Sequence, residues 1–116
     1  MFARRRARER DAEFLSELRW QWRSGCSATP LSQLVYTPSG AARSVPLIGQ
    51  IDLGPPVTFT VRMRAGQTLD DYTAAAPVIA SAMDVAALRI VPLAPHWIRV
   101  VLVPASGAER HDPSAA

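Results

Sequence analysis

Few side chains in this 116-residue sequence are of a type and spacing that could carry out chemistry. The single cysteine, Cys26, lies in a Ser/Gly-rich segment far from both histidines, so a Cys–His nucleophile pair has little support. His96 and His111 have no second histidine or cysteine at metal-ligand spacing. Asp70 and Asp71 are adjacent carboxylates, but the start of a helix explains them without acid–base work. We therefore expect no catalytic residue, no metal site and no cofactor.

The motifs that hold nucleotides are also missing from the sequence. It contains neither a GxxxxGK[ST] loop nor a GxGxxG turn, which would cradle phosphates with backbone N–H groups. All 13 basic residues are arginines, and without lysine there is neither a phosphate-binding lysine nor a Schiff base. We predict that the chain is not an enzyme.

Positive charge is concentrated at the N-terminus. Seven arginines and four acidic residues lie in the first 23 positions, so the net charge of +3 falls entirely in this segment. The candidate phosphate-binding residues are Arg4, Arg5, Arg6, Arg8 and Arg10. Such a cluster can bind the phosphates of DNA or of anionic lipid headgroups, or it can be a solvated terminus without a ligand. Charge alone does not separate these alternatives.

Length and composition describe one small domain. A chain of 116 residues corresponds to about one domain, and a hydrophobic content of 48% argues against wholesale disorder. No apolar run approaches the ~18 residues of a membrane-spanning helix, and the basic start lacks the apolar stretch of a secretory signal. A single cysteine favours a reducing compartment. We expect a cytoplasmic protein, or one held peripherally at the inner membrane surface.

Residues 1–23 are predicted to form an Arg-rich arm and an amphipathic helix over 9–23. Phe14, Leu18 and Trp22 recur at helical spacing and form one apolar stripe, which we interpret as a surface for packing against a partner. Ser24-Gly25 is a typical helix stop. Residues 24–44 then read as a linker or irregular loop, interrupted by a short extended run at Gln33–Thr37.

The segment 45–104 is predicted to form an α+β domain. A first strand begins near Leu47, and residues 57–64 alternate between apolar and polar in the pattern of a half-buried strand. Thr68 and Asp71 stand in the capping-box relation at the start of a helix that runs to about Met83, with a kink expected at Pro77. Two further strands, 88–93 and 97–103, form a hairpin.

The order is therefore ββαββ, or βαββ with an accessory first strand, in a small sheet with one packed helix. A sheet of this size leaves edges that can pair with a second copy or with a larger partner. Residues 105–116 are predicted to be a flexible tail.

The segment Arg62–Met83 lies within VRMRAGQTLDDYTAAAPVIASAM, which resembles a signature of actinobacterial FtsK/SpoIIIE-type (TraB-like) DNA translocases of conjugative plasmids and integrative elements. The similar positions are Gly66, Gln67, Thr68, Asp71, Ala74–Ala76, Ala82, Leu88–Pro92 and Ile98–Leu102. The likeness covers most of the chain from about Trp20. It departs from the family pattern at Pro77 and at Ser114, where the family has a helix-favouring residue and a leucine.

The resemblance implies the pre-motor α/β module of such a translocase, without its ATPase motor or membrane anchor. The expected function is a non-catalytic accessory module of a mobile genetic element. It would bind an FtsK-type translocase or itself through a sheet edge and an apolar helix face, with the basic arm near DNA or membrane. The alternatives are a small DNA-binding regulator of the same element, or a truncated translocase remnant without activity. The regulator has less support because the helix near 68–83 contains no arginine.

Overall fold

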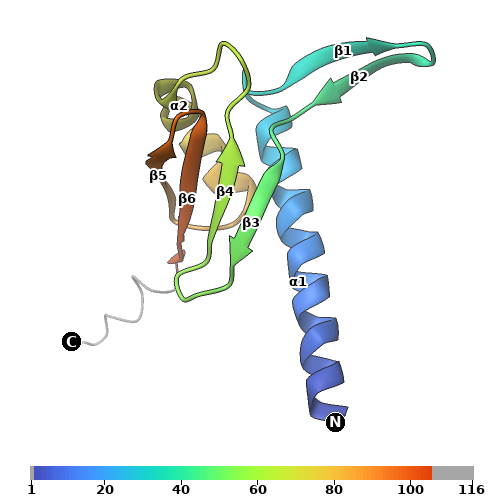
Figure 1. Ribbon diagram of the computed structural model, residues 1–116, viewed down its shortest axis with the longest axis vertical. Helices are drawn as coiled ribbons and strands as arrows, with labels where there is room; N and C mark the ends of the chain where they lie inside the picture. The colour runs from blue at the N-terminus through green and yellow to red at the C-terminus, as the bar shows by residue number, and fades with distance from the viewer. Residues whose placement is uncertain (1, 106–116) are drawn as a thin grey trace.

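A computed structural model describes residues 2–105, with side chains from Glu9 onward, and the described chain has an α+β fold, as expected (Figure 1). In chain order the elements are α1 (Phe2–Ser27), β1 (Gln33–Thr37), β2 (Gly40–Ser44), β3 (Ile48–Asp52), β4 (Thr58–Arg62), α2 (Leu69–Ala82), β5 (Ala87–Ala94) and β6 (Trp97–Val103).

Four strands form an antiparallel sheet in the order β3-β4-β6-β5. The helix α2 connects β4 to β5, and β6 then returns between them, which confirms the predicted ββαββ order. The predicted hairpin of the last two strands is also confirmed, with His96 at its turn in a left-handed conformation (φ 67°). The strands β1 and β2 form a separate two-stranded antiparallel sheet.

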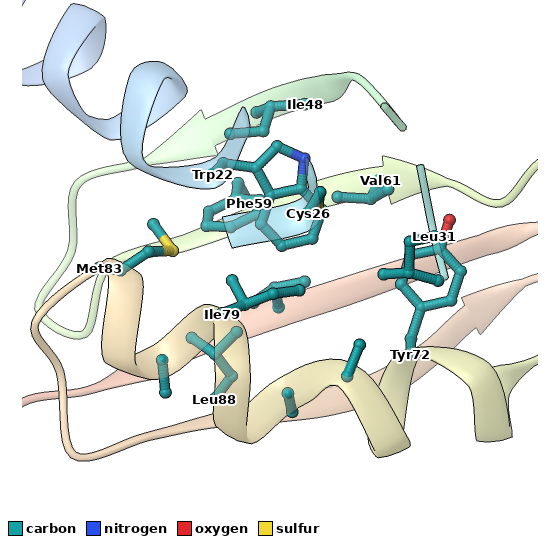
Figure 2. Close-up of a cluster of buried hydrophobic side chains, with 14 of the residues drawn as sticks. Trp22, Cys26, Leu31, Ile48, Phe59, Val61, Tyr72, Ile79, Met83 and Leu88 are labelled. Atoms are coloured by element: carbon teal, nitrogen blue, oxygen red, sulfur yellow. The ribbon is translucent and has the colours of Figure 1, made fainter. Parts of the chain in front are cut away.

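Both helices pack on the same face of the four-stranded sheet, where the core lies (Figure 2). Alternate residues of the strands point into this core, so Phe59 and Val61 of β4 are buried while their neighbours are not. Trp22 of α1 meets Phe59 edge-on, with ring centroids 5.2 Å apart. Its indole N–H donates to the carbonyl oxygen of Pro46 at 2.7 Å, so the buried polar atom is satisfied.

The start of α2 confirms the predicted capping box. The Thr68 side chain accepts from the backbone N–H of Asp71, and the Asp71 carboxylate accepts from the backbone N–H of Thr68. Pro77 lies inside the helix, which continues to Ala82. The proline is exposed, so its ring points away from the core.

The predicted end of the first helix at Ser24-Gly25 is wrong. The helix α1 continues to Ser27, and Gly25 lies where α1 crosses α2. A Cβ at this position would lie 3.1 Å from the Ile79 Cα and 3.2 Å from the Ala82 Cβ. Gly25 therefore allows the two helices to approach each other closely. Glycine is also common just after helix ends, so its identity alone did not distinguish the two roles.

The predicted linker over 24–44 is also wrong, because most of it is ordered as the end of α1 and the β1–β2 hairpin. Only the extended run at Gln33–Thr37 was expected, and it matches β1. The predicted flexible tail 105–116 lies, apart from Ala105, outside the described residues.

Candidate functional site

The β1–β2 hairpin extends away from the body of the molecule (Figure 1). Every residue of β1 is exposed, including Leu34 (52% exposed), Val35 (39%) and Tyr36 (78%). Leu34 and Tyr36 point to one face of the hairpin and Val35 to the other, since side chains alternate along a strand. Three consecutive large apolar side chains on a projecting strand are typical of a contact surface.

Arg64, just after β4, attaches both ends of the hairpin to the body. One guanidinium nitrogen, Nη1, donates to Gln33 Oε1 at 3.2 Å, at the first residue of β1. The other, Nη2, donates to Ser44 Oγ at 2.5 Å and to the Val45 carbonyl oxygen at 2.7 Å, at the end of β2. Charge-assisted bonds from one planar group to both strand ends fix the direction in which the hairpin leaves the sheet.

Gln67, in the turn before α2, makes a second attachment. Its Nε2 donates to the Leu31 carbonyl oxygen at 3.1 Å, next to the start of β1. Its Oε1 accepts from the Arg64 backbone N–H at 2.9 Å and from the buried Tyr72 hydroxyl at 2.5 Å. Gly66 supplies the left-handed turn (φ 88°) that brings Gln67 to this position. The Gly66-Gln67-Thr68 motif thus has a structural role here, because it joins β4, α2 and the hairpin.

The exposed edge of β1 lacks the features that usually prevent edge-to-edge pairing. Charged residues, proline and bulges protect edge strands in natural sheets. Among the other edge strands of the described chain, β5 contains Arg89 and Pro92, and β2 contains Arg43. The edge strand β3 has an irregular register after Ile48, whose carbonyl oxygen accepts from Arg19 Nη1 at 3.3 Å. The strand β1, with the sequence QLVYT, has none of these features.

The predicted phosphate-binding arginines lie on the first turns of α1. Arg4, Arg5, Arg6 and Arg8 are within the helix, and Arg10 is exposed. These turns lie at the end of α1 opposite the hairpin (Figure 1). The structure thus places the arginine cluster and the exposed hairpin at two ends of the molecule. A ligand at the arginines and a partner at the hairpin could therefore bind at the same time.

The predicted partner surface on α1 is wrong for two of its three residues. Leu18 and Trp22 are 2% exposed and belong to the core of the chain itself, so they are not available to a partner. Phe14 is 43% exposed. Leu18 and Trp22 do lie on one apolar face of an amphipathic helix, but the sheet and α2 of the chain itself cover this face.

The titratable side chains differ in how far they are buried. Cys26 is fully buried, and burial raises the pKa of its thiol from an ordinary value of 9.0 to about 12. Burial, and to a smaller extent the nearby Cys26, raises the pKa of the Tyr72 phenol. His96 is exposed, and its backbone carbonyl oxygen accepts from the Met63 N–H at 2.7 Å. His111 lies outside the described residues.

Within the described residues, no group of three or more His, Cys, Asp or Glu side chains could hold a metal ion. None of the helices in this part of the chain is long and apolar enough to cross a membrane.

Comparisons of the chain with protein-family models, with curated proteins and with solved structures find no match. The resemblance to the FtsK/SpoIIIE-type translocases therefore stays a prediction from the quoted motifs.

Proposed function

We propose that the chain is a non-catalytic assembly module of a mobile genetic element and that it pairs with a second copy of itself through β1. The observation that supports this proposal is the unprotected, uncharged edge of β1 on a hairpin held in place by Arg64 and Gln67. A translocase subunit is the other partner that the resemblance implies, and the same strand is the one it would meet.

The β1 sequence suits antiparallel pairing about a two-fold axis. If Val35 lies opposite Val35 of the second copy, Leu34 of each copy lies opposite Tyr36 of the other. Leu34 and Tyr36 share one face, so the pairing gathers four apolar side chains on that face. Aromatic–aliphatic cross-strand pairs each contribute about 0.2–1 kcal/mol, and no charged side chain opposes another in this register.

Pairing would also stabilise the projecting hairpin. A two-stranded hairpin is marginally stable in water, whereas three or more strands with an apolar face are stable. Two hairpins joined edge to edge make a four-stranded sheet with β1 of both copies at its centre. The association is expected to be weak and reversible, because the buried area is small compared with that of standard interfaces.

Sedimentation velocity over a range of protein concentrations tests the pairing. Wild type is expected to shift from monomer to dimer as the concentration rises. Tyr36→Asp places a carboxylate beside Leu34 of the second copy and should keep the protein monomeric. Ala42→Asp is the matched control and should still dimerise, because Ala42 lies on β2, the outer strand of the proposed four-stranded sheet, and faces away from Tyr36. A wild type that stays monomeric at every concentration would contradict the proposal.

The proposed role of Arg4, Arg5, Arg6, Arg8 and Arg10 is non-specific binding of phosphates. The projection of the first turns of α1 and the exposure of Arg10 support it. Replacing all five with alanine should weaken binding to duplex DNA or to anionic vesicles and lower its salt dependence. Parallel titrations with duplex and with vesicles separate the two sources of phosphate, and an unchanged salt slope for both would reject this role.

A further inference from the structure

The four-stranded sheet has one face that neither helix covers. Figure 1 looks onto this face, with α2 behind the sheet. The residues of β4, β5 and β6 that alternate with the buried ones point to it. Three of them are exposed arginines, one on each strand: Arg62, Arg99 and Arg89.

The strand register places these arginines on a diagonal. Arg62 lies opposite Trp97, Arg99 lies opposite Thr60, and Arg89 lies opposite Val101. Each arginine is therefore one strand and two residues away from the next, a step of about 7–8 Å. The remaining cross-strand neighbour, Val91 opposite Arg99, is also uncharged. Three like charges stand in a row without a carboxylate as direct cross-strand partner, and this arrangement is complementary to a chain of anions.

Trp97 lies opposite Arg62 and two residues before Arg99, and it adds an aromatic group to this face. Its Cζ3 is 3.4 Å from where a Cβ on Gly49 would stand, so the indole reaches from β6 across β4 to β3. The same Cβ would lie 2.7 Å from Thr60 Oγ1, so a side chain at position 49 would displace its neighbours. Gly49 thus leaves room for the half-buried indole along the surface of the sheet.

Two depressions adjoin the diagonal, one at its Arg62 end and one at Arg99 in its middle. Arg62, His96 and Leu47 contribute to one of about 680 Å³. Arg99, Thr60 and the acidic Asp52 contribute to the other, of about 720 Å³. Both volumes are in the range of small-molecule sites, and both combine polar groups with an arginine.

We infer that this sheet face binds a single-stranded polynucleotide, with Arg62, Arg99 and Arg89 on successive phosphates and Trp97 stacked on a base. A row of cations alone would fit any polyanion. The indole beside it selects a polyanion with flat aromatic groups, and bases are free to stack only when the strand is single. The inference does not depend on the arm or on the pairing of β1, since it uses other residues.

Fluorescence anisotropy of the full-length protein with a labelled oligothymidylate about 12 nucleotides long tests the inference, because such domains cover about 4–16 nucleotides. Trp97→Leu keeps an apolar side chain but cannot stack, and it should weaken binding about 5- to 150-fold. Trp97→Phe should restore most of the affinity. The triple replacement of Arg62, Arg89 and Arg99 with alanine should lower the magnitude of the logarithmic salt slope by about 2.

Arg23→Ala is the matched control, because Arg23 is exposed on α1 and away from the sheet face. It removes one positive charge where the triple variant removes three, and it should change the affinity less than 2-fold. Circular dichroism of each variant checks that the sheet is intact. If Trp97→Leu fails to fold, the replacement of the three exposed arginines still tests the inference.

The competitors distinguish the ligands. A single strand of DNA or of RNA should compete well, and which of the two competes better identifies the source. Duplex of the same length should compete poorly. The inference would be overturned if duplex bound with the same affinity as single strand. It would also be overturned if heparin displaced the oligonucleotide equally from wild type and from Trp97→Leu, or if the sheet-face variants bound like Arg23→Ala. If only the variant lacking the five arm arginines lost binding to the oligonucleotide, the inference would also be overturned. The proposed role of the arm would then still stand.

Discussion

The Arg64 guanidinium donates to the Val45 carbonyl oxygen at 2.7 Å, and this bond ties the core sheet to the end of the β1–β2 hairpin. The same nitrogen also binds Ser44, and the neighbouring nitrogen binds Gln33. The hairpin contributes little to the core, since both of its strands are almost entirely exposed. Its orientation therefore depends on this polar attachment more than on apolar packing.

Arg64→Ala should loosen the hairpin without unfolding the sheet. Bonds to a charged group are worth about 1.5–3 kcal/mol each, and the variant removes all those made by the guanidinium. Amide hydrogen exchange should become faster in β1 and β2 and change little in β4 and β6. Arg62→Ala, an exposed arginine two residues earlier, is the control. Unchanged exchange in the hairpin of Arg64→Ala would show that something else holds it.

Gly25→Ala should destabilise the protein even though alanine is the better helix former. The added Cβ would stand 3.1 Å from the Ile79 Cα, which is backbone and cannot swing away. Overpacking of this kind costs about 1–3 kcal/mol. Urea denaturation measures the loss against Ser24→Ala, an exposed neighbour on the same helix. If Gly25→Ala is as stable as the control, the two helices do not approach as closely as described.

Gln67→Ala should cost more than Tyr72→Phe. The first variant leaves the Leu31 carbonyl, the Arg64 amide and the buried Tyr72 hydroxyl without a shared partner. The second removes one bond while Gln67 keeps its other two partners, a loss of about 0.5–1.5 kcal/mol. Thermal or urea unfolding of both variants and of the double variant gives the coupling. Additive losses would contradict a direct bond between the two side chains.

The buried thiol predicts a pH dependence at alkaline pH. Below pH 9 Cys26 is protonated in both the folded and the unfolded state, so its contribution is constant. Above pH 9 the unfolded chain ionises while the native thiol, with its pKa raised to about 12, keeps its proton. The free energy of unfolding therefore falls by about 1.4 kcal/mol per pH unit from this group, until the native pKa is reached.

Urea unfolding of wild type and Cys26→Ala between pH 8 and about pH 10 measures this contribution, because the phenol of Tyr72 begins to add a similar term only near its ordinary value of 10.0. Wild type should lose about 1.4 kcal/mol more than the variant by pH 10. The absolute stability of the variant, which leaves a small cavity, does not enter the comparison. Parallel pH profiles would mean that the thiol is accessible in the native state.

The core of the α+β domain was predictable because its signals are local. Alternation along β4, the capping box of Thr68 and Asp71, and the hairpin before Trp97 each depend on residues close in sequence. The hairpin β1–β2 was not predicted, since its residues are exposed on both faces and leave no apolar periodicity. The run Gln33–Thr37 followed by Pro38-Ser39-Gly40 was the available signal, because proline and glycine there are typical of a turn.

The attachments of the hairpin could not be predicted, because they join residues far apart in the chain. Arg64 and Val45 are 19 positions apart, and Gln67 and Leu31 are 36 positions apart. Gly25 was misread for the same reason, since a close contact with Ile79 and a helix stop both favour glycine. Periodicity identified the buried face of α1 around Leu18 and Trp22, but it could not say whether the chain itself or a partner covers that face.

Disulfide cross-linking at Val35 tests the proposed pairing most directly. In the antiparallel register centred on Val35, the two Cα atoms at this position lie about 4.5–5.5 Å apart, within reach of a disulfide. Residues at position 34 of the two copies lie about 8 Å apart, beyond that reach. In a Cys26→Ala background under mild oxidation, Val35→Cys should form covalent dimers rapidly and Leu34→Cys should form few. Equal cross-linking of the two variants, or none for either, would contradict assembly through β1.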